Sequence, residues 1–277
     1  MEVVEISTSG DRIQDVALSR VGGRDFFTKD IEDALLDERI DLAVHSFKDL
    51  ATDNPPGLTI GAVLERADPR DALVAPPGTD LSSLPPGSVV GTSSLRRKAF
   101  LAAARSDVGT RELRGNVPTR LRRFQDGDYD ALLLAAAGLE RLGLAAHIAR
   151  RLDPDVMTPA PAQGAVAVQI RDSDPVTRRW VGALDHSATA VATRAERILL
   201  SVLEGGCQVP VGALARLEGQ ELHLRARVAD LDGSVSLFVE MRGPADDPEA
   251  LGRDAAEALL ARGAAEILER IREATAG

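Results

Sequence analysis

The sequence predicts an α/β protein with two similar lobes, followed by a smaller α+β unit with a three-stranded antiparallel sheet. Apolar segments at 40–44 and 129–133 each follow a predicted helix, so strands and helices alternate in two successive parts of the chain. Three later runs of alternating apolar and polar residues are separated by the turn pairs Glu218-Gly219 and Asp232-Gly233. The first pattern is typical of α/β lobes and the second of an antiparallel sheet.

Residues 1–70 contain the elements expected of the first lobe. Ile31, Ala34 and Leu35 have helical spacing, and the apolar strand after them ends at the segment His45 to Asp49. In an open α/β sheet, groups just past the carboxyl end of a strand line the ligand crevice. In order, we expect a strand at 3–7, a turn at 10–11, a helix at 28–38, strands at 41–44 and 58–64, and a polar connector at 65–70.

The same pattern starts again near residue 88. Thr92-Ser93-Ser94 suits a helix N-cap, and Pro118 suits the first turn of a second helix. The segment Pro159-Ala160-Pro161-Ala162 is expected to form a hinge, after which a strand returns to the first lobe. In order, we expect a strand at 88–91, helices at 95–104 and from 118, a strand at 129–134 and the returning strand at 165–170.

The C-terminal part is expected to form the α+β unit. Apolar residues from Val191 to Leu203 keep helical spacing up to Gly205-Gly206, a pair suited to ending a helix. Strands are predicted at 209–217, 221–229 and 234–241, and one long helix at about 248–274 closes the chain. The expected domains are residues 1–64 together with 165–182, residues 70–158, and residues 187–277.

Composition excludes several classes of protein. With 277 residues, 44 % apolar and 27 % charged, the chain is long enough for two or three compact units and is not disordered. The aromatic content of 3 % and the net charge of −10 disfavour nucleic-acid binding, and the longest apolar run, residues 131–139, is too short to cross a membrane. Because the start carries no secretory signal and one cysteine is unpaired, we expect a cytoplasmic protein.

One stretch of the chain is strongly cationic despite the acidic total. Residues 96–125 hold nine Arg or Lys against two acidic residues. Hydroxyl groups at a helix start, followed by Arg96 and Arg97, are suited to binding an anion through backbone N–H groups and guanidinium forks. A capped helix with a solvated basic face is the alternative. Arg114 and Arg120 favour the anion site, because Gly115 beside Arg114 suits the close approach of a ligand.

Two further features carry chemistry. Lys48 should favour the ionised form of Asp49, whose carboxylate is suited to stabilising a developing cation and passing protons; a structural ion pair is the alternative.

Cys207 alone would be interpreted as a small buried hydrophobe, but together with the cationic stretch it suggests a covalent anchor for an anionic intermediate. The four histidines lack metal-ligand spacing and no phosphate-binding loop is present, so neither a metal nor a nucleotide site is predicted.

Six blocks of the sequence, in the right order, resemble the porphobilinogen deaminase family, also called hydroxymethylbilane synthase. They are His45–Leu50, Glu65–Ala72, Gly91–Arg97, Leu113–Val117, Pro159–Ala165 and Leu203–Pro210. The resemblance covers essentially the whole chain. It implies two doubly wound α/β domains, similar to periplasmic binding proteins, and an α+β third domain whose cysteine loop carries a dipyrromethane cofactor by a thioether. Cys207 matches that cysteine.

The resemblance also implies roles for individual residues. Asp49 would be the catalytic carboxylate, with Lys48 as its catalytic neighbour. The cofactor would be bound by Ser46, Lys48, Asp11, Thr92, Ser94, Arg96, Arg97, Arg114, Gly115 and Gln163, and the substrate by Arg114, Arg120, Arg141, Phe27 and Arg20. Asp11, Arg20, Arg24 and Phe27 match a loop over the cleft, although lysines are common in the family at the positions of Arg20 and Arg24.

The start of the chain departs from the family pattern. Family members usually open with a further strand, a loop bearing an arginine and a serine that touch the cofactor, and a helix. This sequence starts near the family's second strand. If the polypeptide begins at Met1, the first lobe is expected to lack one strand and one anion ligand; a start codon further upstream is the alternative.

The reaction implied by the resemblance joins four porphobilinogen molecules head to tail, with loss of ammonia, into hydroxymethylbilane, a transferase step of tetrapyrrole and heme biosynthesis. Loss of ammonia from an aminomethylpyrrole leaves an azafulvenium cation, which a fixed carboxylate would stabilise. A tether at Cys207 would make each addition a local reaction. We expect a monomer that binds this small molecule and neither nucleic acid nor a membrane. The alternative is a non-catalytic anion-binding protein on the same two-lobed scaffold, in which Cys207 has no role.

Overall fold

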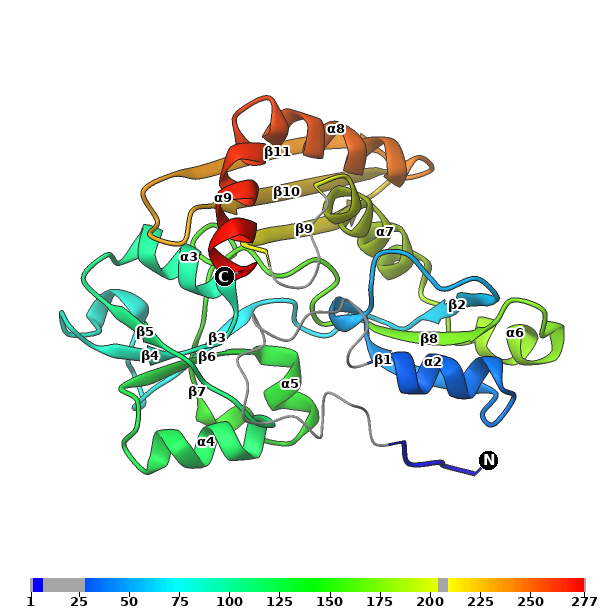
Figure 1. The fold of residues 1–277 in the computed structure, drawn as a ribbon, viewed down its shortest axis with the longest axis horizontal. Coiled ribbons are helices and arrows are strands. Elements are labelled where there is room, and N and C mark those ends of the chain that lie inside the picture. Colours follow the sequence, from blue (N-terminus) through cyan, green and yellow to red (C-terminus); the bar gives the residue numbers. More distant parts are fainter. Residues whose placement is uncertain (1, 7–27, 204–208, 277) are drawn as a thin grey trace.

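Three β-sheets organise the part of the chain that the computed structural model describes, namely residues 2–6, 28–203 and 209–276 (Figure 1). Sheet A has the strand order β1-β8-β2, sheet B the order β5-β4-β6-β3-β7, and sheet C the order β11-β10-β9. The mixed α/β architecture with a separate three-stranded antiparallel sheet confirms the predicted fold class. None of the described helices combines the length and the apolar character needed to cross a membrane.

Sheet A is built from two strands near the start of the described chain and one that returns from far along it. The strand β8 (Val166–Arg171) lies between β1 (Leu42–Ser46) and β2 (Leu58–Val63) and is antiparallel to both. This confirms the predicted return of the chain to the first lobe. Helix α2 (Lys29–Leu36) clusters with Ala43 on one face, and α6 (Pro175–Gly182) clusters with Val168 and Ile170 on the other.

Sheet B also has helices on both faces. Its strands are β5 (Gly109–Arg111), β4 (Val89–Gly91), β6 (Ala131–Ala135), β3 (Asp71–Val74) and β7 (Ile148–Arg151); β4 is parallel to β5 and β6, whereas β3 is antiparallel to β6 and β7. Because side chains alternate along a strand, Leu133 of β6 packs with Phe100 of α3 (Leu95–Ala104), while Leu132 packs on the opposite side. That side is covered by α4 (Val117–Gln125) and α5 (Ala136–Arg141).

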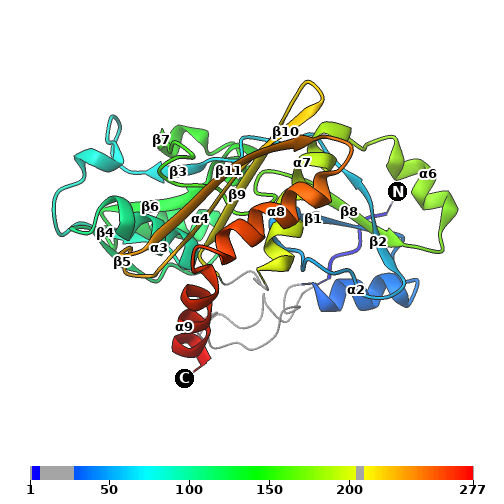
Figure 2. The same cartoon turned by 90° about the horizontal axis from the view of Figure 1, so that it is seen from above.

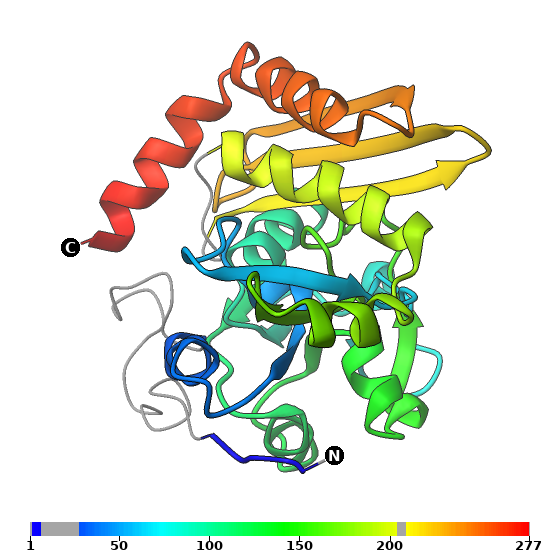
Figure 3. The same ribbon diagram turned by 90° about the vertical axis from the view of Figure 1, so that its right-hand side faces the viewer.

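Sheet C carries its helices on one face (Figure 2). Strands β9 (Val211–Glu218), β10 (Glu221–Ala229) and β11 (Ser236–Pro244) form the predicted antiparallel sheet, and α7 (Ser187–Val202), α8 (Pro248–Leu260) and α9 (Ala264–Ala276) pack on it. The prediction of one long helix at 248–274 was wrong. The helix breaks at Gly263, whose φ of +97° lies in the left-handed region that favours glycine, and α8 and α9 then run in different directions (Figure 3).

Local sequence signals explain where several elements begin. Ser94 and Asn116 are the N-caps of α3 and α4, and their side chains accept hydrogen bonds from the backbone N–H groups of Arg97 and Thr119.

The expected strand at 3–7 was wrong for residues 2–6, which are irregular and largely exposed; Ser7 lies outside the described residues. An alternating segment becomes a strand only where a neighbouring strand accepts and donates its hydrogen bonds. Short 3-10 helices, which the sequence did not suggest, occur at Phe47–Asp49, Leu81–Ser83 and Ala145–His147.

Candidate active site

The turn that follows β1 presents Lys48 and Asp49. It is a single 3-10 turn, η2 (Phe47–Asp49), and the backbone N–H of Phe47 donates a hydrogen bond to the carbonyl oxygen of Ala165 at 3.1 Å. The side chains of Phe47 and Leu50 are buried on either side, whereas Asp49 is exposed and Lys48 is half-buried. The apolar anchors therefore hold the turn against sheet A and leave the carboxylate accessible. Ser46 lies exposed at the end of β1, next to this turn.

Lys48 connects the turn to the segment that leads from sheet B to sheet A. Its Nζ donates to Oε1 of Gln163 at 3.4 Å. Burial lowers the pKa of the Lys48 ammonium; Asp49 and Asp71 oppose this shift, whereas Arg97 and Arg96 add to it. The charge of Lys48 thus interacts both with Asp49 of the same turn and with two of the predicted arginines, Arg96 and Arg97.

Asp71 is the centre of a buried ionic cluster. It is the first residue of β3 and has no exposed surface. Arg96 donates from Nη1 to Oδ2 of Asp71 at 2.6 Å, and Arg97 donates from Nε to Oδ1 at 2.9 Å. The side-chain amide of Gln163 donates to the same Oδ1 at 3.1 Å. Burial acts to raise the pKa of the Asp71 carboxyl, but Arg96 and Arg97 outweigh it and hold the pKa far below its usual range.

This cluster changes the interpretation of the arginines at the start of α3. Arg96 also donates to the carbonyl oxygen of Thr158, and Arg97 donates to that of Leu133, so both guanidinium groups point into the protein. Each is less than 10 % exposed. Asp71 was not among the predicted site residues. The sequence held no signal for it, because only the tertiary structure shows that Arg96 and Arg97 are buried and so require a carboxylate partner.

The loop before α4 is tied to the start of α3. Ser93, which was not among the predicted site residues, donates from Oγ to the carbonyl oxygen of Leu113 at 2.5 Å and accepts from the N–H of Leu113 at 3.2 Å. Arg114 follows directly; its Nε lies 3.4 Å from Oε1 of Glu112, while its buried Nη2 has no hydrogen-bond partner among the described residues. Within the described part of the chain, the guanidinium of Arg114 therefore has a buried N–H donor, at Nη2, that no acceptor uses.

Arg120 belongs to the same electrostatic group. Its Nε donates to the carbonyl oxygen of Gly115 at 2.7 Å. Burial is the largest cause that lowers the pKa of the Arg120 guanidinium. Together with the lowering effects of Arg97 and Arg114, and against the opposing effects of Asp49 and Glu112, it brings this pKa to about 10. The structure therefore brings Arg120 close enough to Arg97, Arg114 and Asp49 for its charge to interact with theirs. An anion placed among these guanidinium groups would relieve their mutual repulsion.

Replacing Gly115 by alanine is expected to weaken substrate binding, because Gly115 sets the position of Arg114. Gly115 has a φ of +99°, and an added Cβ would lie 2.8 Å from Cγ2 of Thr119. We expect the KM of Gly115→Ala to rise about tenfold, together with a loss of roughly 1–3 kcal/mol of stability. Gly127→Ala is the matched control, since Gly127 has a φ of +81° but no atom within 4 Å of the added Cβ. Equal KM values for the two variants would contradict the role given to the Arg114 loop.

The remaining described residues of the predicted site have local partners. Thr92 is buried, and its Oγ1 accepts from the N–H of Ser94 at 3.2 Å, so both hydroxyls serve the start of α3. Arg141, at the end of α5, donates to the carbonyl oxygen of Gly164 at 2.7 Å. It therefore contacts the segment next to Gln163. Asp11, Arg20, Arg24, Phe27 and Cys207 lie outside the described residues.

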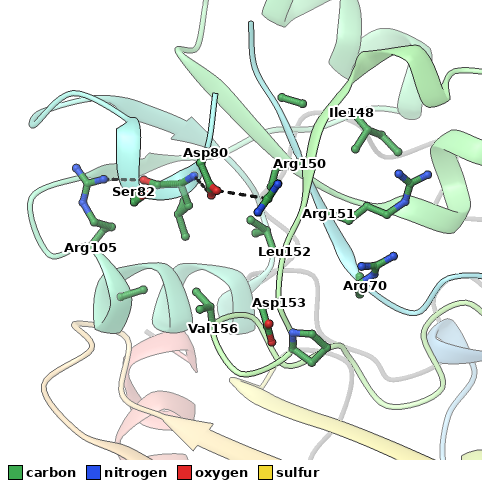
Figure 4. Close-up of a pocket in the computed structure, with 14 residues that line it drawn as sticks. Arg70, Asp80, Ser82, Arg105, Ile148, Arg150, Arg151, Leu152, Asp153 and Val156 are labelled. Atoms are coloured by element: carbon green, nitrogen blue, oxygen red, sulfur yellow. Dashed lines mark hydrogen bonds and ion pairs between the residues drawn. The ribbon is translucent and has the colours of Figure 1, made fainter. Parts of the chain in front are cut away.

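A separate hollow lies at the outer edge of sheet B and does not contain the predicted site. It has a volume of about 810 Å³ and is lined by parts of β7, α3 and the segment 80–82 (Figure 4). None of the predicted site residues lines it. Its arginines are paired with carboxylates, as Arg70–Asp68, Arg105–Asp107, Arg150–Asp80 and Arg151–Glu140. Because these charges cancel, the hollow offers no excess of positive charge to an anion.

The described residues contain no group of three or more His, Cys, Asp or Glu side chains that could hold a metal ion. What they do contain is a cluster in which Lys48, Arg96, Arg97, Arg114 and Arg120 outnumber the carboxylates of Asp49, Asp71 and Glu112. The fold and the site thus define a two-lobed α/β protein that can hold a carboxylate-rich ligand against a fixed carboxylate.

Two family models match this chain: "Porphobilinogen deaminase, dipyromethane cofactor binding domain" over residues 1–179 and "Porphobilinogen deaminase, C-terminal domain" over residues 190–261. The chain belongs to the porphobilinogen deaminase family.

Curated relatives support the assignment of the chain to this family. A porphobilinogen deaminase from Moorella thermoacetica is 50 % identical over 270 residues, which are 98 % of this chain and 86 % of the relative. Another, from Oceanobacillus iheyensis, is 46 % identical over 273 residues, covering 98 % and 88 % of the two chains. Among solved structures, a TRAP periplasmic solute binding protein from Desulfovibrio salexigens matches with a TM-score of 0.39 and 13 % identity over 89 % of this chain and 81 % of its own. That score is too low to support an argument.

Proposed function

We propose that this chain catalyses the head-to-tail joining of four porphobilinogen molecules into hydroxymethylbilane, with release of one ammonia per addition, on a covalently bound dipyrromethane. The observation that carries the proposal is the link from the Asp49 turn through Lys48 and Gln163 to the arginine cluster, because it puts a carboxylate beside excess positive charge. Membership in a family named for this activity supports it. A non-catalytic anion-binding role is not favoured, since the curated relatives are named as enzymes.

The described residues fit a dipyrromethane with acidic side chains. Arg96 Nε and Arg114 Nη2 are buried donors without a hydrogen-bond partner in the described part of the chain, which is what a site for added carboxylates requires. When bound, the group supplies the pyrrole carbon that bonds to the first substrate and a thioether tether to Cys207. The side chains that would hold it are Ser46, Lys48, Asp11, Thr92, Ser94, Arg96, Arg97, Arg114, Gln163 and the backbone at Gly115.

Asp49 acts on the charge that develops on the substrate. When ammonia leaves the aminomethyl group, the pyrrole becomes cationic, and a fixed carboxylate lowers the energy of that state. The new carbon–carbon bond then requires loss of a proton from the attacking ring, and Asp49 is the accessible base. Lys48 stands beside it with a lowered pKa, so it gives up a proton more readily than an exposed lysine does.

The other arginines bind the incoming substrate. Each porphobilinogen brings two carboxylates, so positive charge must remain available after the buried pair with Asp71 is formed. Arg114, Arg120 and Arg141 are the proposed substrate ligands in the described chain, and Arg20 and Phe27 would complete the set. Planar guanidinium groups match carboxylates in a bidentate manner, which orients each new ring before reaction.

The proposed domains follow the three sheets. Residues 1–64 with 165–182 contain sheet A and the catalytic carboxylate, residues 70–158 contain sheet B and the arginines, and residues 187–277 contain sheet C and the cysteine loop. We further propose that the enzyme acts as a cytoplasmic monomer. Size-exclusion chromatography with light scattering tests the monomer, for which a mass near 29.4 kDa is expected.

The covalent anchor has a direct test. Denatured wild-type protein should exceed its sequence mass by one dipyrromethane and should turn red with Ehrlich's reagent, because a thioether survives unfolding. Cys207→Ser should show neither signal and no turnover, with the circular dichroism spectrum of a folded protein. An unmodified mass in catalytically active wild-type protein would refute the anchor.

A further inference from the structure

An arginine of α7 reaches the turn that carries Lys48 and Asp49. Arg197 is 9 % exposed, and its guanidinium lies over the ring of Phe47, with 4.3 Å between Cζ and the ring centroid. The same group donates hydrogen bonds to one carbonyl oxygen of the turn, that of Phe47, and to those of the three residues that directly follow the turn, Leu50, Ala51 and Thr52. Nη1 donates to Leu50 at 3.1 Å and Phe47 at 3.4 Å; Nη2 donates to Thr52 at 3.2 Å and to Ala51.

The chain just after the turn needs such a donor because residues 50–52 belong to neither a helix nor a strand, so no regular backbone ladder serves their carbonyl oxygens. The 3-10 helix ends at Asp49 and the chain becomes extended at Leu50, where the 3-10 hydrogen-bond pattern no longer continues. Buried carbonyl oxygens without donors are costly. A planar guanidinium with five donors on a rigid fork can serve several oxygens at once, which an ammonium cannot do with the same geometry.

Arg197 is itself held firmly, because α7 is anchored at the preceding residue. Glu196 is fully buried and accepts from Arg66 Nη1 at 2.6 Å, from the N–H of Ala162 at 2.6 Å and from the N–H of Ala215 at 2.7 Å. These contacts fix α7 to the connecting segments and to β9. The helix ends at Val202, five residues before Cys207 in the sequence. One rigid helix therefore reaches the Asp49 turn and leads into the cysteine loop.

We infer that Arg197 is a positioning residue that holds the Lys48–Asp49 turn in its catalytic geometry and ties it to the helix leading to the cysteine loop. The inference rests on the proposed function of Asp49. Arg197 touches no reacting group; it acts through the backbone that carries Asp49. A displacement of about 1 Å in such a group typically reduces the rate by about 10²-fold.

The test compares Arg197→Lys with Arg194→Lys. The first variant keeps the charge and the alkyl stem but loses the guanidinium fork; the second alters an exposed arginine of the same helix that pairs with Glu249. We expect Arg197→Lys to lower kcat about 10- to 100-fold, with unchanged KM and a full complement of dipyrromethane by mass spectrometry. Amide hydrogen exchange should accelerate in peptides covering residues 47–52 and remain unchanged in β9–β11. Arg194→Lys should match the wild type in all four measurements.

Asp49→Asn, measured in parallel, separates the two hypotheses. If Asp49→Asn is inactive while Arg197→Lys has the kcat of the wild type, the positioning role is wrong and the proposed function stands. If Arg197→Lys loses dipyrromethane and thermal stability, while kcat per loaded molecule is unchanged, Arg197 is merely structural and the inference also fails. If loaded Asp49→Asn turns over normally, the proposed role of Asp49 is wrong.

Discussion

Asp49→Asn is expected to lower kcat by roughly 10²- to 10⁴-fold, the usual range for loss of a positioned acid–base group. The amide has the shape of the carboxylate but carries no charge, so it can neither stabilise the cation left by departing ammonia nor accept the proton released afterwards. Binding of the substrate carboxylates depends on the arginines instead. KM should therefore change much less than kcat, and the mass of one dipyrromethane should still be present on Cys207.

The measurement is steady-state turnover of porphobilinogen by protein whose dipyrromethane content has been confirmed by mass. Asp53→Asn is the control, because Asp53 is an exposed carboxylate four residues further along the same segment. It should retain wild-type kcat. Activity of Asp49→Asn within a few-fold of the wild type would show that the catalytic carboxylate has been assigned to the wrong residue.

Asp71→Asn is expected to have the largest effect on stability. The asparagine leaves Arg96 and Arg97 buried without their counter-charge, and removal of one partner from a buried ionic cluster typically costs about 3–5 kcal/mol. The free energy of unfolding, measured in urea, should fall by that amount. Asp107→Asn is the control, since Asp107 pairs with Arg105 at the surface, where such pairs contribute about 0–1 kcal/mol. Similar losses for the two variants would contradict the central role of Asp71.

The pH dependence of this difference provides a second check. The pKa of Asp71 is lowered in the folded protein, so its ionisation contributes stability that is present above its unfolded pKa, near 3.9, and is lost as the pH falls toward the folded value. The difference in melting temperature between the wild type and Asp71→Asn should therefore be full at pH 7 and smaller at pH 3. A difference that does not change with acidification would show that the charge of Asp71 is not responsible.

Much of the local structure could be predicted from the sequence. The helix at 95–104 begins after its Ser94 cap, the second helix starts next to Pro118, and the three strands of sheet C follow the alternating runs. These features depend on residues that are neighbours in the chain, such as a hydroxyl and an N–H group three residues later. The strands β3, β5 and β7 were not predicted, because they have only three or four residues each and depend on hydrogen bonds from strands that are distant in the sequence.

The candidate site was predictable only in its chemistry. The sequence predicts roles for Lys48, Asp49, Gln163 and the arginines. It does not show that Arg96 and Arg97 share the buried carboxylate of Asp71, or that the mutual effects of Arg97, Arg114 and Arg120 lower the pKa of Arg120. The sequence also does not distinguish the arginines of the hollow at the edge of sheet B, each of which has a carboxylate partner, from arginines that form a site with excess positive charge.

By itself, the sequence determined the fold class, the family and the inventory of charged groups, because these depend on periodicity, caps and local motifs. The tertiary structure decided which charges meet. Asp71 and Arg96 are 25 positions apart, and Arg197 is 150 positions from the carbonyl of Phe47 to which it donates. Contacts at such separations depend on how the sheets pack, and burial makes each of them strong enough to fix a pKa or hold a turn.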